Sequence, residues 1–279
     1  MAENHRLPTQ SLVQFVGAGL IVSGVMFLLA RYFQIPWLSL LIVPMFGIAF
    51  LIAGITRKQI GLLIPGCILI GLGVGAFILL APFFNLETIQ KYGYLIAAFG
   101  MSWLVVAGLI YFYKREIAWW AVLISAISLS IGLCLLSTPA GILDFVLFIC
   151  LGTGSVFLAW GIHKKLLGLI IPGSLLTTIG AGVYLGWTTI GKPNGLTGTG
   201  IMLVWFALGW IMITVFSRVI TTRFVWWPLI PGGILAVVGW GLYIGGNPGN
   251  AVSFISNTGS IALIISGIYL LLLRRGIQR

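Results

Sequence analysis

Ten apolar runs, each long enough to cross a lipid bilayer, follow one another along the chain. A helix needs about 20 apolar residues to cross the ~30 Å hydrocarbon layer of a membrane. Backbone amides have no water partner in that layer, so each run is predicted to be a helix. The sequence therefore predicts an all-α polytopic membrane protein. The predicted spans are residues 12–31, 37–56, 60–82, 92–113, 117–137, 142–161, 166–187, 199–217, 224–245 and 257–273.

The composition leaves no polar surface for a soluble fold. Only 7% of the residues are charged and 60% are hydrophobic, whereas a soluble domain carries about 25% charged residues. The first apolar run, residues 12–30, is too long for the core of a signal peptide, so we interpret it as an uncleaved span. Cys67, Cys134 and Cys150 lie within apolar runs and form no CxxC pair, which indicates a packing role.

Basic residues gather at alternate turns between the predicted spans. Twelve fall on the side that holds the N-terminus, and three (Arg31, Lys91 and Lys192) fall on the other side. Because cytoplasmic flanks of spans collect Lys and Arg, both termini of this multi-pass membrane protein are predicted to be cytoplasmic. The charges are scattered in ones and twos, so nucleic-acid binding is not expected. The twelve are Arg6, Arg57, Lys58, Lys114, Arg115, Lys164, Lys165, Arg218, Arg223, Arg274, Arg275 and Arg279.

A helical hairpin recurs five times in the sequence. Ile-Pro-Gly at 64–66 returns at 171–173 and 230–232, and glycines follow each proline by eight and by ten residues. The fifth span joins this pattern when Trp119-Trp120 is aligned with Trp226-Trp227. The order is the same in each copy, so these are parallel repeats. The hairpins of this single membrane domain are predicted over residues 12–58, 60–115, 117–165, 166–223 and 224–279.

The glycines after each proline are predicted to let neighbouring helix backbones approach closely. Small residues are enriched where transmembrane helices pack, and GxxxG spacing recurs in three of the spans. We expect these glycines to pack hairpins together, and contact between copies of the chain is the alternative. The predicted packing positions are Gly73, Gly75, Gly132, Gly180, Gly182, Gly239 and Gly241.

Two stretches resemble a known family. Trp227-Pro228-Leu229-Ile230, and the return helix that runs from residue 259 to the basic pair at 274–275, resemble the two-helix transmembrane units of the bacterial LiaI/LiaF-like group. The resemblance implies a tandem array of short Gly- and Leu-rich hairpins in a bacterial membrane protein. The soluble β-domain of LiaF-type sensors has no counterpart in the sequence, so the resemblance implies no signalling role and carries over no functional residue.

Groups that could carry catalysis are scarce. Asp144 is the one carboxylate close to a span, where a helix dipole would favour it, and a rim site for a cation or a partner loop is the alternative. No two acids share a predicted helix face. The histidines are His5 in the N-terminal tail and His163 in a basic turn, and neither belongs to a motif with metal-ligand spacing. We therefore expect no enzymatic activity, no cofactor and no metal.

Two functions of different classes fit these features. The first is a structural or interaction role, in which helices pack with membrane lipids, with other membrane proteins or with a second copy of the chain. The second is transport of an uncharged or apolar solute, because ten spans with both ends inside resemble the layout of the drug/metabolite transporter superfamily. Those transporters have two five-span halves, whereas this chain repeats every two spans. No predicted span has an ionisable group near its centre, so ion-coupled transport is not expected.

Overall fold

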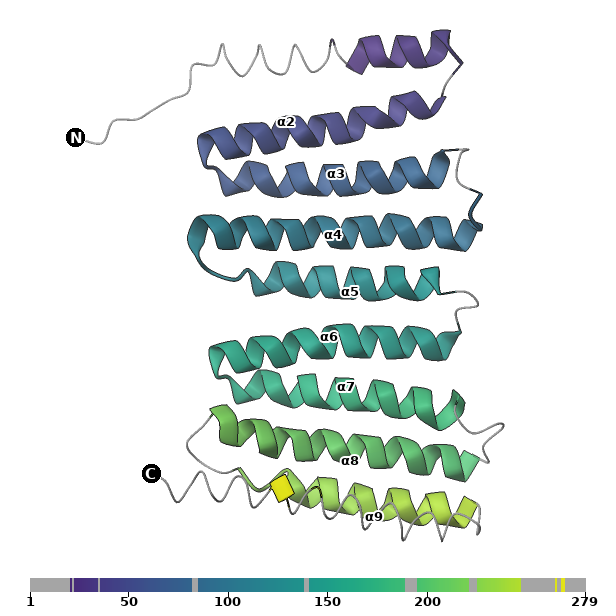
Figure 1. Cartoon of the computed structure of the whole chain (residues 1–279), viewed down its shortest axis with the longest axis vertical. Coiled ribbons are helices and arrows are strands. Elements are labelled where there is room, and N and C mark those ends of the chain that lie inside the picture. Colours follow the sequence, from purple (N-terminus) through teal and green to yellow (C-terminus); the bar gives the residue numbers. More distant parts are fainter. Residues whose placement is uncertain are drawn as a thin grey trace, which may run out of the picture. The chain divides into compact units, whose positions relative to one another are not determined.

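All the secondary structure in the described part of the chain is helical (Figure 1). The computed structural model describes residues 21, 23–34, 36–81, 85–137, 141–188, 195–220, 225–246, 264 and 267–268. Eight of the described helices are long and apolar enough to cross a membrane. The predicted all-α polytopic membrane fold is confirmed.

The described helices follow the predicted spans closely. The first predicted span is helical over residues 23–32, and all but a few residues of the tenth, 257–273, lie outside the described residues. The elements are η1 (Pro36–Leu41), α2 (Ile42–Arg57), α3 (Ile60–Leu80), α4 (Thr88–Lys114), α5 (Trp119–Leu136), α6 (Ile142–Lys164), α7 (Leu167–Thr188), α8 (Gly195–Ile220) and α9 (Leu229–Gly246).

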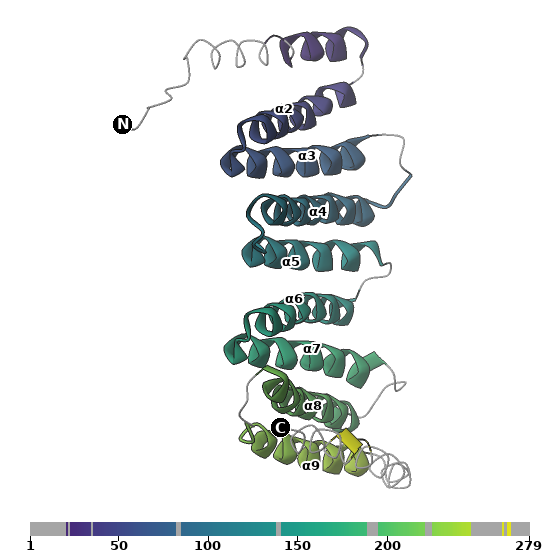
Figure 2. The ribbon, with the colours of Figure 1, turned by 60° about the vertical axis from the view of Figure 1, so that its left-hand side comes forward.

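The chain divides into two units, Met1–Gly141 and Ile142–Arg279. Within the first unit, α2 to α5 lie antiparallel, and each packs against the next helix in sequence (Figures 1 and 2). Within the second unit, α6 to α9 do the same. Other pairs of these helices inside one unit make at most marginal contact. The long helices described in each unit therefore form a row one helix thick. The division between the units falls inside the hairpin predicted over 117–165.

Two helix starts differ from prediction because of local hydrogen-bonding chemistry. Helix α4 begins at Thr88 rather than 92, because Glu87 and Gln90 form a capping box in which Gln90 Oε1 accepts from the Glu87 N–H at 3.3 Å. Residues 36–41 form a 3₁₀ helix before α2. Pro44 has no N–H to donate to the carbonyl of Leu40, so the α-helical ladder is incomplete there.

Two later helices also start at different residues. Helix α8 begins at Gly195, four residues before the predicted 199, so the Gly-rich stretch 195–200 is helical. Helix α9 begins at Leu229 rather than 224. Pro228 lies in the turn before it, and Pro231 falls in the first turn, where its missing N–H would have no helical partner.

The turns α2–α3 and α6–α7 have the same hydrogen bonds. The Lys58 N–H donates to the Ile55 carbonyl at 3.3 Å, and the Gln59 N–H donates to the Gly54 carbonyl at 3.0 Å. The corresponding bonds after α6 run from Lys165 to residue 162 at 3.3 Å and from Leu166 to residue 161 at 2.9 Å. This is the Schellman pattern, with Lys58 and Lys165 in the left-handed conformation.

Candidate functional site

Glycines eight residues after each Pro position, here called the first packing position, lie against the preceding helix. A Cβ atom added to Gly73 on α3 would lie 2.5 Å from the ring of Pro44 on α2. A Cβ atom added to Gly132 on α5 would lie 2.8 Å from the backbone nitrogen of Ala97 on α4. Distances this short leave no room for a side chain, so helix backbones meet at these residues.

The second unit has the same arrangement at the same position. A Cβ atom added to Gly180 on α7 would touch the Cβ of Cys150 on α6. One added to Gly239 on α9 would lie 2.9 Å from the carbonyl oxygen of Gly200 on α8. In all four copies the glycine meets the helix that precedes its own in sequence.

Glycines two residues further on, the second packing position, face the following helix. A Cβ atom added to Gly75 would lie 2.7 Å from the Leu95 side chain on α4, and one added to Gly182 would lie 2.7 Å from the Cβ of Trp205 on α8. Two residues turn a helix by about 200°, so the two positions point to opposite neighbours. No described atom lies within 4 Å of a Cβ position on Gly241.

Glycines not identified from the sequence complete these contacts. Gly47 faces Gly66 across α2 and α3, where each added Cβ would lie 2.8–3.0 Å from the other residue's carbonyl oxygen. Gly154 and Gly173 repeat this contact across α6 and α7 at 2.9–3.0 Å. The partners Gly47 and Gly154 stand 107 residues apart, as do Gly66 and Gly173. That constant offset is the sequence signal by which they could be found.

Aromatic side chains also recur at the 107-residue offset. Trp103 on α4 and Trp120 on α5 meet edge to face, with centroids 5.5 Å apart. Trp210 on α8 meets Trp227, just before α9, in the same way at 5.8 Å. Each pair is extended by a phenylalanine one turn before the first tryptophan. The two aromatic triads are Phe99, Trp103 and Trp120, and Phe206, Trp210 and Trp227.

One contact exchanges a glycine and a hydroxyl residue between the units. In the first unit, Gly71 on α3 faces Ser102 on α4, where an added Cβ would lie 2.5 Å from the serine Cβ. At the positions 107 residues later, Thr178 on α7 faces Gly209 on α8, and an added Cβ there would touch Thr178 Oγ1. In both contacts a glycine meets a hydroxyl residue. The glycine lies on the earlier helix of the pair in the first unit and on the later helix in the second unit.

The buried hydroxyls of the second unit are largely satisfied within their own helices. Ser174 Oγ donates to the Ile170 carbonyl at 2.9 Å, Thr178 Oγ1 to the Ser174 carbonyl at 2.9 Å, and Ser217 Oγ to the Thr214 carbonyl at 2.7 Å. Serine and threonine commonly form such bonds in transmembrane helices. The hydroxyls of these three residues are therefore accounted for by helix structure, whereas the buried hydroxyls of Thr153 and Thr214 have no hydrogen-bond partner among the described residues.

Asp144 lies in the first turn of α6, as its position in the sequence predicts. A carboxylate there is favoured by the positive end of the helix dipole. His163 is exposed at the opposite end of the same helix, beside Lys164. Within the described residues, no group of three His, Cys, Asp or Glu side chains could hold a metal ion.

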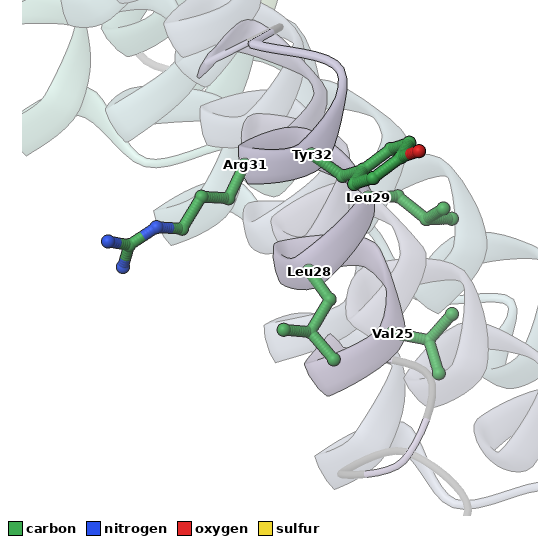
Figure 3. A pocket seen from close by; sticks show the side chains of 5 residues that line it. All are labelled: Val25, Leu28, Leu29, Arg31 and Tyr32. Atoms are coloured by element: carbon green, nitrogen blue, oxygen red, sulfur yellow. The ribbon is translucent and has the colours of Figure 1, made fainter.

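A shallow apolar hollow lies along the first described helical segment (Figure 3). Its lining residues are Val25, Leu28, Leu29, Arg31 and Tyr32, all within eight consecutive positions. Arg31 points away from Tyr32, and most of these side chains are exposed. The hollow is the outer surface of one helix, without converging polar groups.

The geometry of the described residues supports close helix packing and polar contact at the basic turns. Ionisable side chains lie at helix ends, where they can meet water or lipid headgroups. These features by themselves indicate no reaction. No protein-family model, curated protein or solved structure matches the chain.

Proposed function

We propose that the chain is a non-enzymatic structural or interaction protein of the bacterial inner membrane. The observation that carries this proposal is the row of helices in each unit, one helix thick. Large apolar side chains remain exposed along the rows, such as Phe112 at 71% and Val237 at 74% of their surface. Apolar faces of this kind suit lipid chains or the helices of other membrane proteins.

A solute path would need helices on several sides of it. Among the described helices, one row forms a wall and does not enclose a space. The hydroxyls of Ser174, Thr178 and Ser217 bond to the backbone of their own helices. These two observations favour the structural role over transport of an uncharged solute.

Thiol labelling distinguishes the two functions. In a full-length variant with Cys67, Cys134 and Cys150 replaced by alanine, a single cysteine is placed at Thr178, in the middle of α7. We expect a membrane-impermeant maleimide to leave Thr178→Cys unlabelled, because helix packing and lipid exclude water there. Lys165→Cys in the exposed turn is the control that must react, with both faces of the membrane made accessible to the reagent. Labelling of Thr178→Cys would point instead to a water-filled path and to transport.

We further propose that the two rows are copies of one four-helix unit. The packing glycines, the turns after α2 and α6, the aromatic triads and the exchanged glycine–hydroxyl pair all recur at one offset of 107 residues. The exchanged pair supports common ancestry, because a glycine meets a hydroxyl residue at this contact in both units, although the two residues have swapped helices. On this proposal the ten predicted spans comprise two rows of four helices, with one further span before them in sequence and one after them.

Both termini are proposed to be cytoplasmic. A reporter that is active only in the cytoplasm should be active when fused after Lys58, Arg115 or Lys165, and silent after Glu87 or Asn194. The physical reason is the excess of basic residues on one side of the predicted spans. Reversed activity at any two of these sites would contradict the orientation.

A further inference from the structure

Three basic turns place a cation where glycine is the usual residue. Lys58, Arg115 and Lys165 end α2, α4 and α6 with φ angles of 53°, 57° and 54°. Residues with a Cβ atom fit this left-handed region less well than glycine does. The chain has 38 glycines, yet no glycine among the described residues has a positive φ. The three cations therefore occupy positions that the backbone alone would give to glycine.

The helix dipole does not account for these cations. A positive charge in the last turn of a helix is stabilising, but each of the three helices already has one there. These are Arg57 in α2, Lys114 in α4 and Lys164 in α6. The left-handed residue adds a second, adjacent and exposed cation. Two adjacent exposed cations in each turn are suited to an anion outside the protein.

The chain itself offers few anions at this end of the helices. The acids among the described residues are Glu87, Glu116 and Asp144. Glu87 and Asp144 lie at the opposite ends of α4 and α6 from the basic turns. Only Glu116 lies in a basic turn, beside Arg115. The turns α2–α3 and α6–α7 have no acid within them.

Aromatic side chains beside the α4–α5 turn indicate headgroup depth for that turn. Tyr111 and Phe112 precede the α4–α5 turn and Trp120 follows it, and all three are substantially exposed. Tyrosine and tryptophan favour the interface between lipid chains and water. The α2–α3 turn and the α4–α5 turn lie two interhelical steps apart in the first row, a distance of about 16–20 Å. One phosphate cannot bridge them, so each turn would hold its own.

We propose that each of these basic turns binds the phosphate of an anionic phospholipid, in the leaflet that the turns face. The paired cations are Arg57 and Lys58, Lys114 and Arg115, and Lys164 and Lys165. This inference rests on the proposed membrane-spanning arrangement and names the lipid class among its partners. Zwitterionic lipids would bind less tightly, because their headgroups carry no net charge.

The test is lipid binding to the full-length protein in mild detergent, followed by native mass spectrometry during titration with phosphatidylglycerol or phosphatidylcholine. Two triple variants remove the cation at Lys58, Arg115 and Lys165, one with glycine and one with glutamine. Glycine fits the backbone better than the native residue, and Gln34 shows that glutamine adopts this conformation in the chain, with φ 55°. Lys91→Gln removes a cation at the other end of α4 as the matched control.

Both triple variants should bind phosphatidylglycerol about fivefold more weakly at each site, the factor that corresponds to ~1 kcal/mol per basic residue near an anionic surface. The melting temperature of the glycine variant should be unchanged or higher. Unchanged phosphatidylglycerol affinity in both variants, equal loss in Lys91→Gln, or equal native affinity for phosphatidylcholine would overturn the proposal. Solubilised protein has no leaflets, so this result is independent of the reporter test of orientation and of the thiol test of function.

Discussion

Replacing Gly173 by leucine is expected to destabilise the α6–α7 pair by roughly 1–3 kcal/mol. A Cβ atom at this position would lie 2.7 Å from the backbone nitrogen of Leu158 and 3.0 Å from the carbonyl oxygen of Gly154. Backbone atoms cannot rotate away as a side chain can, so the helices would have to separate. The measurement is the unfolding midpoint of the full-length protein in detergent.

Gly168→Leu is the matched control on the same helix. Gly168 is exposed, and no described atom lies within 4 Å of an added Cβ. Leucine has the higher helix propensity, so this variant should be neutral or more stable by up to about 1 kcal/mol. Gly180→Leu should also destabilise, since its added Cβ would touch Cys150. Equal loss of stability at Gly168 and Gly173 would mean that close helix approach is not what the glycines provide.

Trp103→Ala is expected to cost about 1–3 kcal/mol in stability. Trp103 connects α4 to α5 through its edge-to-face contact with Trp120, and such pairs contribute about 0.5–1.5 kcal/mol beyond the area they bury. Truncation also leaves a void between the helices. The total is smaller than the ~3–5 kcal/mol of a water-soluble core, because lipid chains are as apolar as the protein interior.

Two further variants test this explanation. Trp210→Ala should lose a similar amount, because Trp210 makes the same contact with Trp227 in the second unit. Trp103→Phe should be nearly neutral, because the buried Trp103 Nε1 has no hydrogen-bond acceptor among the described residues. Trp187→Ala is the control at an exposed tryptophan. A larger loss in Trp187→Ala than in Trp103→Ala would contradict the assigned role of the triad.

Hydropathy and proline positions predict most of the fold, because a span in lipid must satisfy its own backbone. The clearest failure is the start of α8. Residues 195–200 read Gly-Leu-Thr-Gly-Thr-Gly, a composition typical of turns. In the structure they are helical, and Gly198 and Gly200 lie against Gly186 and Gly239. Local composition could not show this, because the partners stand on α7 and α9.

Only part of the candidate site can be predicted from the sequence, for the same reason. Spacing of eight and ten residues after each proline identifies glycines of one kind, but it does not say which helix each faces. Gly73 and Gly75 face α2 and α4 respectively, which depends on the order of helices in the row. From the sequence alone, Trp120 and Trp227 stand just after basic turns, a position typical of interfacial anchors. Their contacts with Trp103 and Trp210 require knowledge of the neighbouring helix.

The row arrangement of α2 to α5 is tested most directly by the distance between its outermost helices. Spin labels would be placed at two exposed residues, Met45 near the start of α2 and Leu133 near the end of α5. Both residues lie at the helix ends away from the basic turns. Three interhelical steps of about 8–10 Å predict a separation of about 24–30 Å by electron–electron double resonance. A closed four-helix bundle would place α2 beside α5, and a distance near 10–15 Å, about one interhelical step plus the label arms, would contradict the row.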